Sequence, residues 1–195
     1  MILNLLDNLA VSFDLPILDW IAENLYCGFL DFLMPIITIL GDAGIFWIAC
    51  SVVLIFFPKQ RKAGAAMLLA LVMGLVVCNM ILKPAVGRIR PYDFKELHFN
   101  ETITPLVGAQ HDFSFPSGHT IASFEAAVAL ALNNKKLGIP ALILACLIAF
   151  SRLYLYVHYP TDVIVSIVLG ALLAVLANFL VRKAFDLYAK KKAAQ

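Results

Sequence analysis

Long apolar segments separated by short polar stretches make up most of the chain after residue 24. A helix that crosses a bilayer needs about 17–25 predominantly apolar residues. The third, fifth and sixth segments reach that length, whereas the first, second and fourth are shorter. The shorter ones are either tilted partners in a helical bundle or helices that reach only the membrane interface. The six segments are 25–40, 43–57, 63–82, 117–132, 137–156 and 161–181.

The first 24 residues combine apolar side chains with three acids, Asp7, Asp14 and Asp19. They lack the basic start of a cleavable signal peptide. Apolar residues that alternate with acids are typical of a helix that lies in the membrane interface. We therefore predict an interfacial helix over residues 1–24. Packing of its apolar face against the rest of the protein is an equal alternative, and the pattern does not decide between them.

The composition supports a membrane protein. Hydrophobic residues make up 62% of the 195 residues and charged residues 14%, against about 45–50% and about 25% in soluble domains. This length suits one domain, so we predict a single all-α membrane bundle of six transmembrane helices over residues 1–195. We expect neither a nucleic-acid partner nor an obligate protein partner. The four cysteines have no close pair, which favours small buried thiols over disulfides or a zinc site.

The basic residues are distributed unequally among the predicted loops. If each segment crosses the membrane once, one side receives ten of the fifteen lysines and arginines, in the stretches 58–64, 133–136 and 182–195. The side that is richer in cations is usually cytoplasmic. We therefore expect both termini in the cytoplasm of a multi-pass plasma-membrane protein. The outer loops nevertheless keep five cations and all four histidines, which indicates a functional site facing outside.

Three outer stretches carry residues that suit a phosphate: KPAVGRIRP (83–91), PSGH (116–119) and SRLYLYVHYPTD (151–162). Arginine matches phosphate oxygens with a planar fork, and lysine adds a compact charge. Backbone N–H groups at a helix start also bind anions, and glycine allows them a close approach. The residues that we predict to bind phosphate are Lys83, Arg90, Ser117, Gly118 and Arg152.

The same stretches supply groups for phosphoryl transfer. Asp162 lies four residues after His158, within reach to hold one imidazole nitrogen and leave the other free to attack phosphorus. His119 would then protonate the leaving oxygen. We expect no metal and no cofactor, because the three cations neutralise the charge that develops in the transition state.

These stretches resemble the three signature motifs of the type 2 phosphatidic acid phosphatase family. The first motif, a lysine separated by six residues from Arg-Pro, is matched by Lys83, Arg90 and Pro91. The second, Pro-Ser-Gly-His, is matched by residues 116–119. The third, Ser-Arg followed by His and Asp, is matched within residues 151–162. No position of the motifs departs from the family pattern, and all three occur in order.

The resemblance implies a membrane bundle similar in its core to the vanadium haloperoxidases, a phosphohistidine on His158, His119 as the general acid, and no metal. The family acts on many phosphate esters, so the substrate stays open. A site on the outer leaflet favours a lipid phosphate. Undecaprenyl diphosphate is our preferred substrate, because the chain is similar in size to bacterial members that act on it. Phosphatidylglycerol phosphate and phosphatidic acid are the alternatives.

A non-catalytic lipid-phosphate binder or transporter is the alternative of another class. Such a protein would need the cations Lys83, Arg90 and Arg152, but neither the pair of His158 and Asp162 nor a second histidine. Because all of these are present, we prefer an enzyme.

Other polar residues carry less information. We expect Arg88 and Lys95 to face lipid headgroups, and the two remaining histidines, His98 and His111, to be loop residues without a catalytic role. The stretch 92–115 is predicted to be a loop that rests on the interface and contacts a lipid chain.

Two residues keep open roles. Glu125 lies inside an apolar segment, where an acid is costly and often functional. Asn79 lies one helical turn before Lys83 and would be able to orient it.

Overall fold

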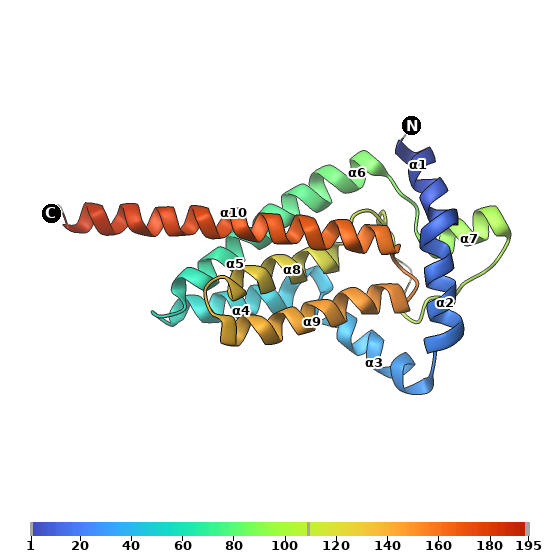
Figure 1. The fold of residues 1–195 in the computed structure, drawn as a ribbon, viewed down its shortest axis with the longest axis horizontal. Coiled ribbons are helices and arrows are strands. Elements are labelled where there is room, and N and C mark those ends of the chain that lie inside the picture. The colour runs from blue at the N-terminus through green and yellow to red at the C-terminus, as the bar shows by residue number, and fades with distance from the viewer. Residues whose placement is uncertain (1, 109, 194–195) are drawn as a thin grey trace.

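The computed structural model describes residues 2–108 and 110–193, and over these residues it contains helices and no strand (Figure 1). The predicted all-α fold is therefore confirmed, and each of the six apolar segments is helical. They form α3 (Gly28–Ile39), α4 (Ile45–Phe56), α5 (Arg61–Gly74) with its extensions η3 (Leu75–Leu82) and α6 (Lys83–Val86), α8 (Gly118–Ala131), α9 (Lys135–Tyr154) and α10 (Pro160–Ala193).

Three helical runs within the described residues are long and apolar enough to cross a membrane: Arg61–Phe99, α9 and α10. Helices α3 and α4 meet this criterion together as one broken span with a bend of 41°. Helix α8 has 14 residues and is shorter than a typical span. The chain is therefore a membrane protein whose described residues contain three or four candidate spans, and the predicted six crossings are not confirmed.

Helix α8 lies at the centre of the bundle and packs against α5, α9 and α10. Its buried side chains include small ones such as Ala126 and Ala127. The neighbouring helices contribute glycines at the contacts, and a Cβ built at Gly138 of α9 would lie 2.2 Å from Cα of Ala131. Small residues let membrane helices approach closely. They explain how α8 becomes enclosed by its neighbours and carries its first turn into the site.

The N-terminal segment is helical, through α1 (Ile2–Leu9), η1 (Ala10–Asp14) and α2 (Leu15–Leu25), and it lies across one end of the bundle (Figure 1). Its side chains Leu18 and Ile21 are buried in a cluster with residues of α3 and of the α9–α10 connection. A packing face is therefore present. The interfacial position that we predicted for this helix is not tested and stays a prediction.

The stretch 92–115 differs from the prediction, because it begins with a helix, α7 (Pro91–Phe99). Tyr92 and Phe94 are buried in the cluster that also holds the N-terminal helix. They are therefore not available to grip a lipid chain, whereas Leu97 and Leu106 are exposed.

The two ends of the bundle differ in the residues that they carry (Figure 1). The α4–α5 connection, the α8–α9 connection and the C-terminal part of α10, which hold the ten basic residues, lie at one end. The three motifs lie at the other end, beside α1 and α2. This arrangement agrees with the separation of charges on which the predicted topology rests.

Candidate active site

The residues of the three motifs meet at one end of the bundle, each from a different element. Five of their side chains are buried even though they are charged or titratable. Lys83 begins α6, Arg90 precedes α7, His119 lies in the first turn of α8, Arg152 lies in the last turn of α9, and His158 lies in the α9–α10 connection.

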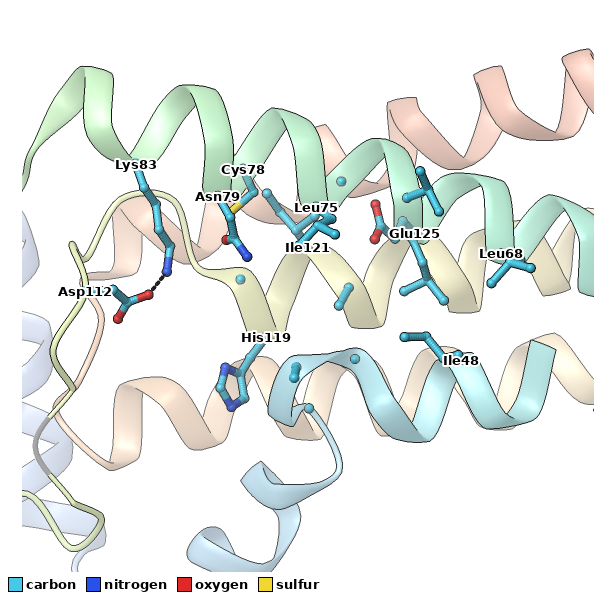
Figure 2. Close-up of a pocket in the computed structure, with 18 residues that line it drawn as sticks. Ile48, Leu68, Leu75, Cys78, Asn79, Lys83, Asp112, His119, Ile121 and Glu125 are labelled. Carbon is cyan, nitrogen blue, oxygen red and sulfur yellow. Dashed lines mark hydrogen bonds and ion pairs between the residues drawn. The ribbon is translucent and has the colours of Figure 1, made fainter. Parts of the chain in front are cut away.

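Asp112 bridges two of the three cations, and Figure 2 shows its contact with Lys83. Its carboxylate accepts hydrogen bonds from Lys83 Nζ and Arg90, and its carbonyl oxygen accepts a bond of 3.0 Å from Arg90 Nε. Burial raises the pKa of the Asp112 carboxyl, but the hydrogen bond and charge of Lys83, with those of Arg90, outweigh burial and lower the pKa to about 2. A carboxylate, like a phosphate, is an anion that accepts hydrogen bonds. The Asp112 carboxylate therefore marks a position where Lys83 and Arg90 can bind an anionic group.

Arg152 is the third cation, and most of its donors are unpaired. Its NH1 donates to Thr38 Oγ1 at 2.6 Å. Its Nε and NH2 are buried and have no hydrogen-bond partner among the residues that the structure describes. Leaving buried guanidinium donors unpaired costs free energy. These two nitrogens therefore indicate a place for an anionic ligand.

His158 is 1% exposed and lies between a cation and a carboxylate. Its Nε2 lies 3.2 Å from Arg90 NH1, and its Nδ1 lies 3.6 Å from Asp162 Oδ2. Burial, followed by the positive charges of Arg90 and Arg152, holds the pKa of the imidazole well below its usual value. The imidazole is therefore neutral at physiological pH. A proton on Nδ1 would leave Nε2 with a lone pair, which in this structure faces the Arg90 NH1 donor.

Ser114 links His158 to Asp162. Its hydroxyl donates to Asp162 Oδ2 at 2.5 Å and lies 3.4 Å from His158 Nδ1. The predicted pair of His158 and Asp162 is therefore present, with a serine beside it that spacing along the chain does not indicate.

Arg88 forms an ion pair with the second oxygen of the Asp162 carboxylate. The prediction that Arg88 faces lipid headgroups is therefore wrong. Arg88 is 2% exposed and donates to Asp162 Oδ1 at 2.5 Å and to Asp14 Oδ2 at 2.7 Å. Asp14 also accepts from the backbone N–H of Thr161 at 2.9 Å. The N-terminal helix is thus joined through Arg88 to the carboxylate next to His158. Lys95 differs from its prediction as well, because it pairs with Asp19 and Glu101.

The start of α8 differs in one respect from the predicted phosphate cradle. The backbone N–H of Ser117 donates to Ser166 Oγ at 2.8 Å and therefore points into the bundle. The amide groups of Gly118 and His119 belong to the first turn, where N–H groups lack intrahelical acceptors. The helix start thus offers Gly118 and His119 as backbone donors, while Ser117 ties α8 to α10.

His119 has its own carboxylate partner, Asp42, at the bend between α3 and α4. His119 Nε2 lies 2.7 Å from Asp42 Oδ1. A Cβ built on the adjacent Gly41 would lie 2.7 Å from His119 Cδ2, so a larger residue there would displace the imidazole. Neither Asp14 nor Asp42 was predicted to be a site residue, although an acid within or beside an apolar segment is the signal that points to each.

A cavity of about 330 Å³ opens beside His119 and Lys83 and extends along α8 between α4, α5 and η3. Figure 2 shows Lys83, Asp112 and His119 at one end of this cavity and Glu125 farther along it. Asn79 also lines the cavity, whereas no hydrogen bond joins it to Lys83 among the described residues. The cavity connects a cationic site with an apolar space, as a lipid phosphate requires.

The fold and the site together define a helical membrane protein with a pocket of cationic side chains next to two histidines, an arrangement suited to phosphoryl transfer. The sequence pattern of the PAP2 superfamily matches residues 63–186. The chain therefore belongs to the PAP2 superfamily, which confirms the resemblance found from the three motifs.

Several relatives are named as lipid phosphatases. Over 183 residues the chain is 34% identical to phosphatidylglycerophosphatase B of Bacillus subtilis, covering 86% of this chain and 76% of that protein. Over 132 residues it is 33% identical to an undecaprenyl-diphosphatase of Sulfolobus acidocaldarius, covering 67% of this chain and 61% of that protein. These names confirm the prediction of a phosphatase at the level of the family.

Solved structures agree with the predicted fold. The crystal structure of a transmembrane PAP2-type phosphatidylglycerolphosphate phosphatase from Bacillus subtilis matches with a TM-score of 0.71 and 27% identity, covering 90% of this chain and 88% of that chain. A bacterial vanadium-dependent iodoperoxidase matches with a TM-score of 0.60 and 18% identity, covering 72% of this chain and 42% of that chain. The core therefore shares its fold with a vanadium haloperoxidase, as we predicted.

Proposed function

We propose that this protein hydrolyses a lipid phosphate or diphosphate through a phosphohistidine on His158, without a metal. The observation that carries the proposal is the buried Arg152 guanidinium, whose Nε and NH2 have no partner among the described residues. Lys83 and Arg90 add two further cations to the same site. A dianionic phosphoryl group would pair these donors and displace the Asp112 carboxylate from its two cations.

The chemistry follows from the two histidines. Nε2 of neutral His158 forms a bond to phosphorus while the bond from phosphorus to the leaving oxygen breaks, and His119 gives its proton to that oxygen. Water then attacks phosphorus, the N–P bond breaks, and His119 takes a proton from the water. Asp162 is proposed to orient His158, and Lys83, Arg90, Gly118 and Arg152 to bind the phosphoryl oxygens.

Ser117 is still proposed to be part of the phosphate-binding site, because it belongs to the second motif. Its backbone N–H is already bonded to Ser166, so its contribution is to fix the first turn of α8. Residues 1–195 are proposed to form a single phosphatase domain, with its motifs in residues 83–162.

We further propose that all six helices cross the plasma membrane, with both termini cytoplasmic and the site outside. The separation of the basic stretches from the motifs supports this orientation. A cysteine introduced at the exposed Leu106 should react in intact cells with a membrane-impermeant reagent, after the exposed Cys27 and Cys146 have been replaced. Labelling that requires lysis would contradict the orientation.

Two lipids are the main substrate candidates. Undecaprenyl diphosphate agrees with our preference from sequence and with the name of the archaeal relative. Phosphatidylglycerol phosphate is favoured by a relative whose match covers more of both chains. Phosphatidic acid shares the diacylglycerol part of the second candidate. All three place a charged phosphate next to an apolar chain, which suits the cavity.

The test is the release of inorganic phosphate in detergent from a panel of these lipids. We expect hydrolysis to continue in the presence of a chelator and to be blocked by vanadate, which mimics five-coordinate phosphorus. Binding of the lipids without phosphate release by the wild-type protein would favour the non-catalytic alternative. Activity that disappears with chelator and returns with a divalent metal would overturn the metal-independent mechanism.

A further inference from the structure

Glu125 is a buried acid for which the proposed reaction has no use. It is 1% exposed, and its Oε2 has no hydrogen-bond partner among the residues that the structure describes. The residue opposite it is Gly74, where a Cβ would lie 2.1 Å from Oε2. The absence of a side chain at residue 74 therefore makes the room that the carboxyl group occupies.

The surroundings of Glu125 favour its protonated form. It lines the cavity together with apolar side chains such as Ile48, Leu75 and Ile121 (Figure 2). A carboxylate without a partner in such surroundings is costly, whereas a protonated carboxyl is neutral and keeps one O–H donor. The cation that lines the same cavity, Lys83, is at its other end and is bonded to Asp112. Glu125 thus presents a donor for an acceptor that a ligand would bring.

The position of Glu125 limits what this acceptor is. It lies seven residues after Gly118, which corresponds to about 10 Å along α8. This distance is too long for Glu125 to exchange a proton directly with a phosphate at the start of α8. A lipid that extends from that phosphate into the cavity would, however, reach Glu125 with the part of the molecule just beyond its headgroup.

The chemistry of a diacylglycerol phosphate matches this distance. Its ester carbonyls lie five or six covalent bonds from phosphorus, roughly 6–7 Å in an extended chain with ordinary bond lengths. A hydrogen bond from the carboxyl O–H adds roughly 2.5–3 Å. The two lengths together are close to the separation along α8. A polyprenyl chain has only hydrocarbon at this depth and would leave the Glu125 donor unpaired.

We propose that Glu125 determines substrate specificity by donating a hydrogen bond to an ester carbonyl of a glycerophospholipid substrate. This inference rests on the proposed function and decides between its candidates. It favours phosphatidic acid, whose phosphate is attached directly to diacylglycerol, over undecaprenyl diphosphate. It also disfavours phosphatidylglycerol phosphate, because the terminal phosphorus of that lipid lies about eleven or twelve covalent bonds from the ester carbonyls, roughly twice the required length. Glu125 is not a catalytic residue, because it does not touch the reacting atoms.

The test compares two lipids that differ only at the carbonyl. Phosphate release is measured from a diacyl glycerol phosphate and from its dialkyl ether analogue with equal chain lengths. We expect the wild-type protein to have a kcat/KM about three- to tenfold higher for the ester, the range of one hydrogen bond. Glu125→Gln keeps an N–H donor and should keep the preference, whereas Glu125→Leu should lose it and gain relative activity on a polyprenyl diphosphate.

A matched control and a second measurement separate the possible failures. Ala122→Leu narrows the same cavity without changing a polar group, so it should lower the activity on ester and ether equally. Binding of both lipids to His158→Ala, which lacks the proposed nucleophile, measures the preference without turnover. If the wild-type protein is active but has no preference for the ester, the inference is wrong. It is also wrong if Glu125→Leu lowers the activity on the ester and on the ether equally. If no lipid is hydrolysed but the ester binds better, the proposed function fails and the inference stands.

Discussion

The site contains two pairs of a histidine and a carboxylate, and they differ in their surroundings. His158 and Asp162 are almost completely buried, with exposures of 1% and 0%. His119 and Asp42 lie at the open side, where the side chains are 16% and 57% exposed. Asp162 receives hydrogen bonds from Arg88, Ser114 and the backbone of Tyr159, whereas Asp42 stands at the bend of a broken helix.

This difference matches two chemical tasks. A nucleophile has to be neutral and fixed relative to phosphorus, and burial with a firmly held carboxylate supplies both properties. A general acid has to regain its proton in every cycle, which requires access to water or to the leaving group. The buried pair therefore suits the nucleophile that we propose, and the open pair suits the proposed acid.

The two pairs also depend on different parts of the chain. The buried pair is held from behind by Arg88 and, through it, by Asp14 of the N-terminal helix. The open pair depends on the bend after α3, where Ala43 and Gly44 have positive φ angles of 48° and 66°. Changes in these two regions should therefore affect the reaction in different ways.

The largest effect is expected from His158→Ala. Removal of the attacking nitrogen should abolish the phosphoenzyme and lower kcat by a factor of about 10⁴ or more, as for other covalent nucleophiles. The measurement is a quench in base during turnover of a phosphorus-labelled substrate, since phosphohistidine survives base and is lost in acid. His119→Ala is the control, and it should still form the labelled protein when the leaving group is a weak base. Label that persists in His158→Ala would assign the nucleophile elsewhere.

Asp162→Asn should lower kcat by about 10²–10⁴-fold, because loss of an orienting carboxylate misplaces the histidine tautomer. Vanadate binding should change little, since Asp162 is not a proposed phosphate ligand. Steady-state kinetics and vanadate titration check both expectations. A large loss of vanadate affinity with an unchanged kcat would contradict the orienting role.

Arg88→Met tests the support of the buried pair. It leaves the carboxylates of Asp14 and Asp162 buried without their common cation, which should destabilise the fold by about 3–5 kcal/mol. Thermal unfolding in detergent measures the change. Lys95→Met is the matched control, because its partners Asp19 and Glu101 are partly exposed and such pairs contribute about 0–1 kcal/mol. A similar loss of thermal stability in both variants would show that the buried network stabilises the fold no more than the exposed pair does.

Asp42→Asn should have a smaller effect that depends on the leaving group. Without the carboxylate, protonated His119 is less stabilised, so we expect a loss of roughly tenfold on a lipid monoester, within the range of acid catalysis. Nitrophenyl phosphate, whose leaving group needs little protonation, should be affected much less. The ratio of kcat values on the two substrates is the measurement, and an equal loss on both would indicate a structural role for Asp42.

The smallest effect is expected in the pH profile. Because the pKa of His158 is held well below its usual value, the imidazole stays neutral as the pH falls below about 6.5, the ordinary pKa of histidine. The acid limb of kcat/KM should therefore lie well below pH 6.5, and activity should be lost only when the pH falls through the lowered pKa. Profiles of the wild type and His119→Ala, recorded on nitrophenyl phosphate, test this. An acid limb near pH 6.5 in both would contradict a buried, neutral nucleophile.

Local patterns in the sequence were enough to predict the helices and the motif residues. Apolar runs identify α3, α4, α5, α8, α9 and α10, because the length and hydrophobicity of a segment can be seen in that segment without knowledge of its neighbours. Spacing within short stretches likewise identified Lys83, Arg90, Arg152, His119 and His158. The pairing of His158 with Asp162 was also predictable, since they are four residues apart in the same stretch.

The packing of the helices decided the rest. Asp14, Arg88 and Asp162 come together although 74 residues separate each neighbouring pair along the chain, and Asp42 meets His119 across 77 residues. Spacing cannot predict such contacts, because they follow from which helices pack together and at which depth. The same holds for Glu125. The sequence alone determined that an acid lies in an apolar helix. The tertiary structure decided that this acid lines the cavity beside the site and that its Oε2 has no hydrogen-bond partner among the described residues.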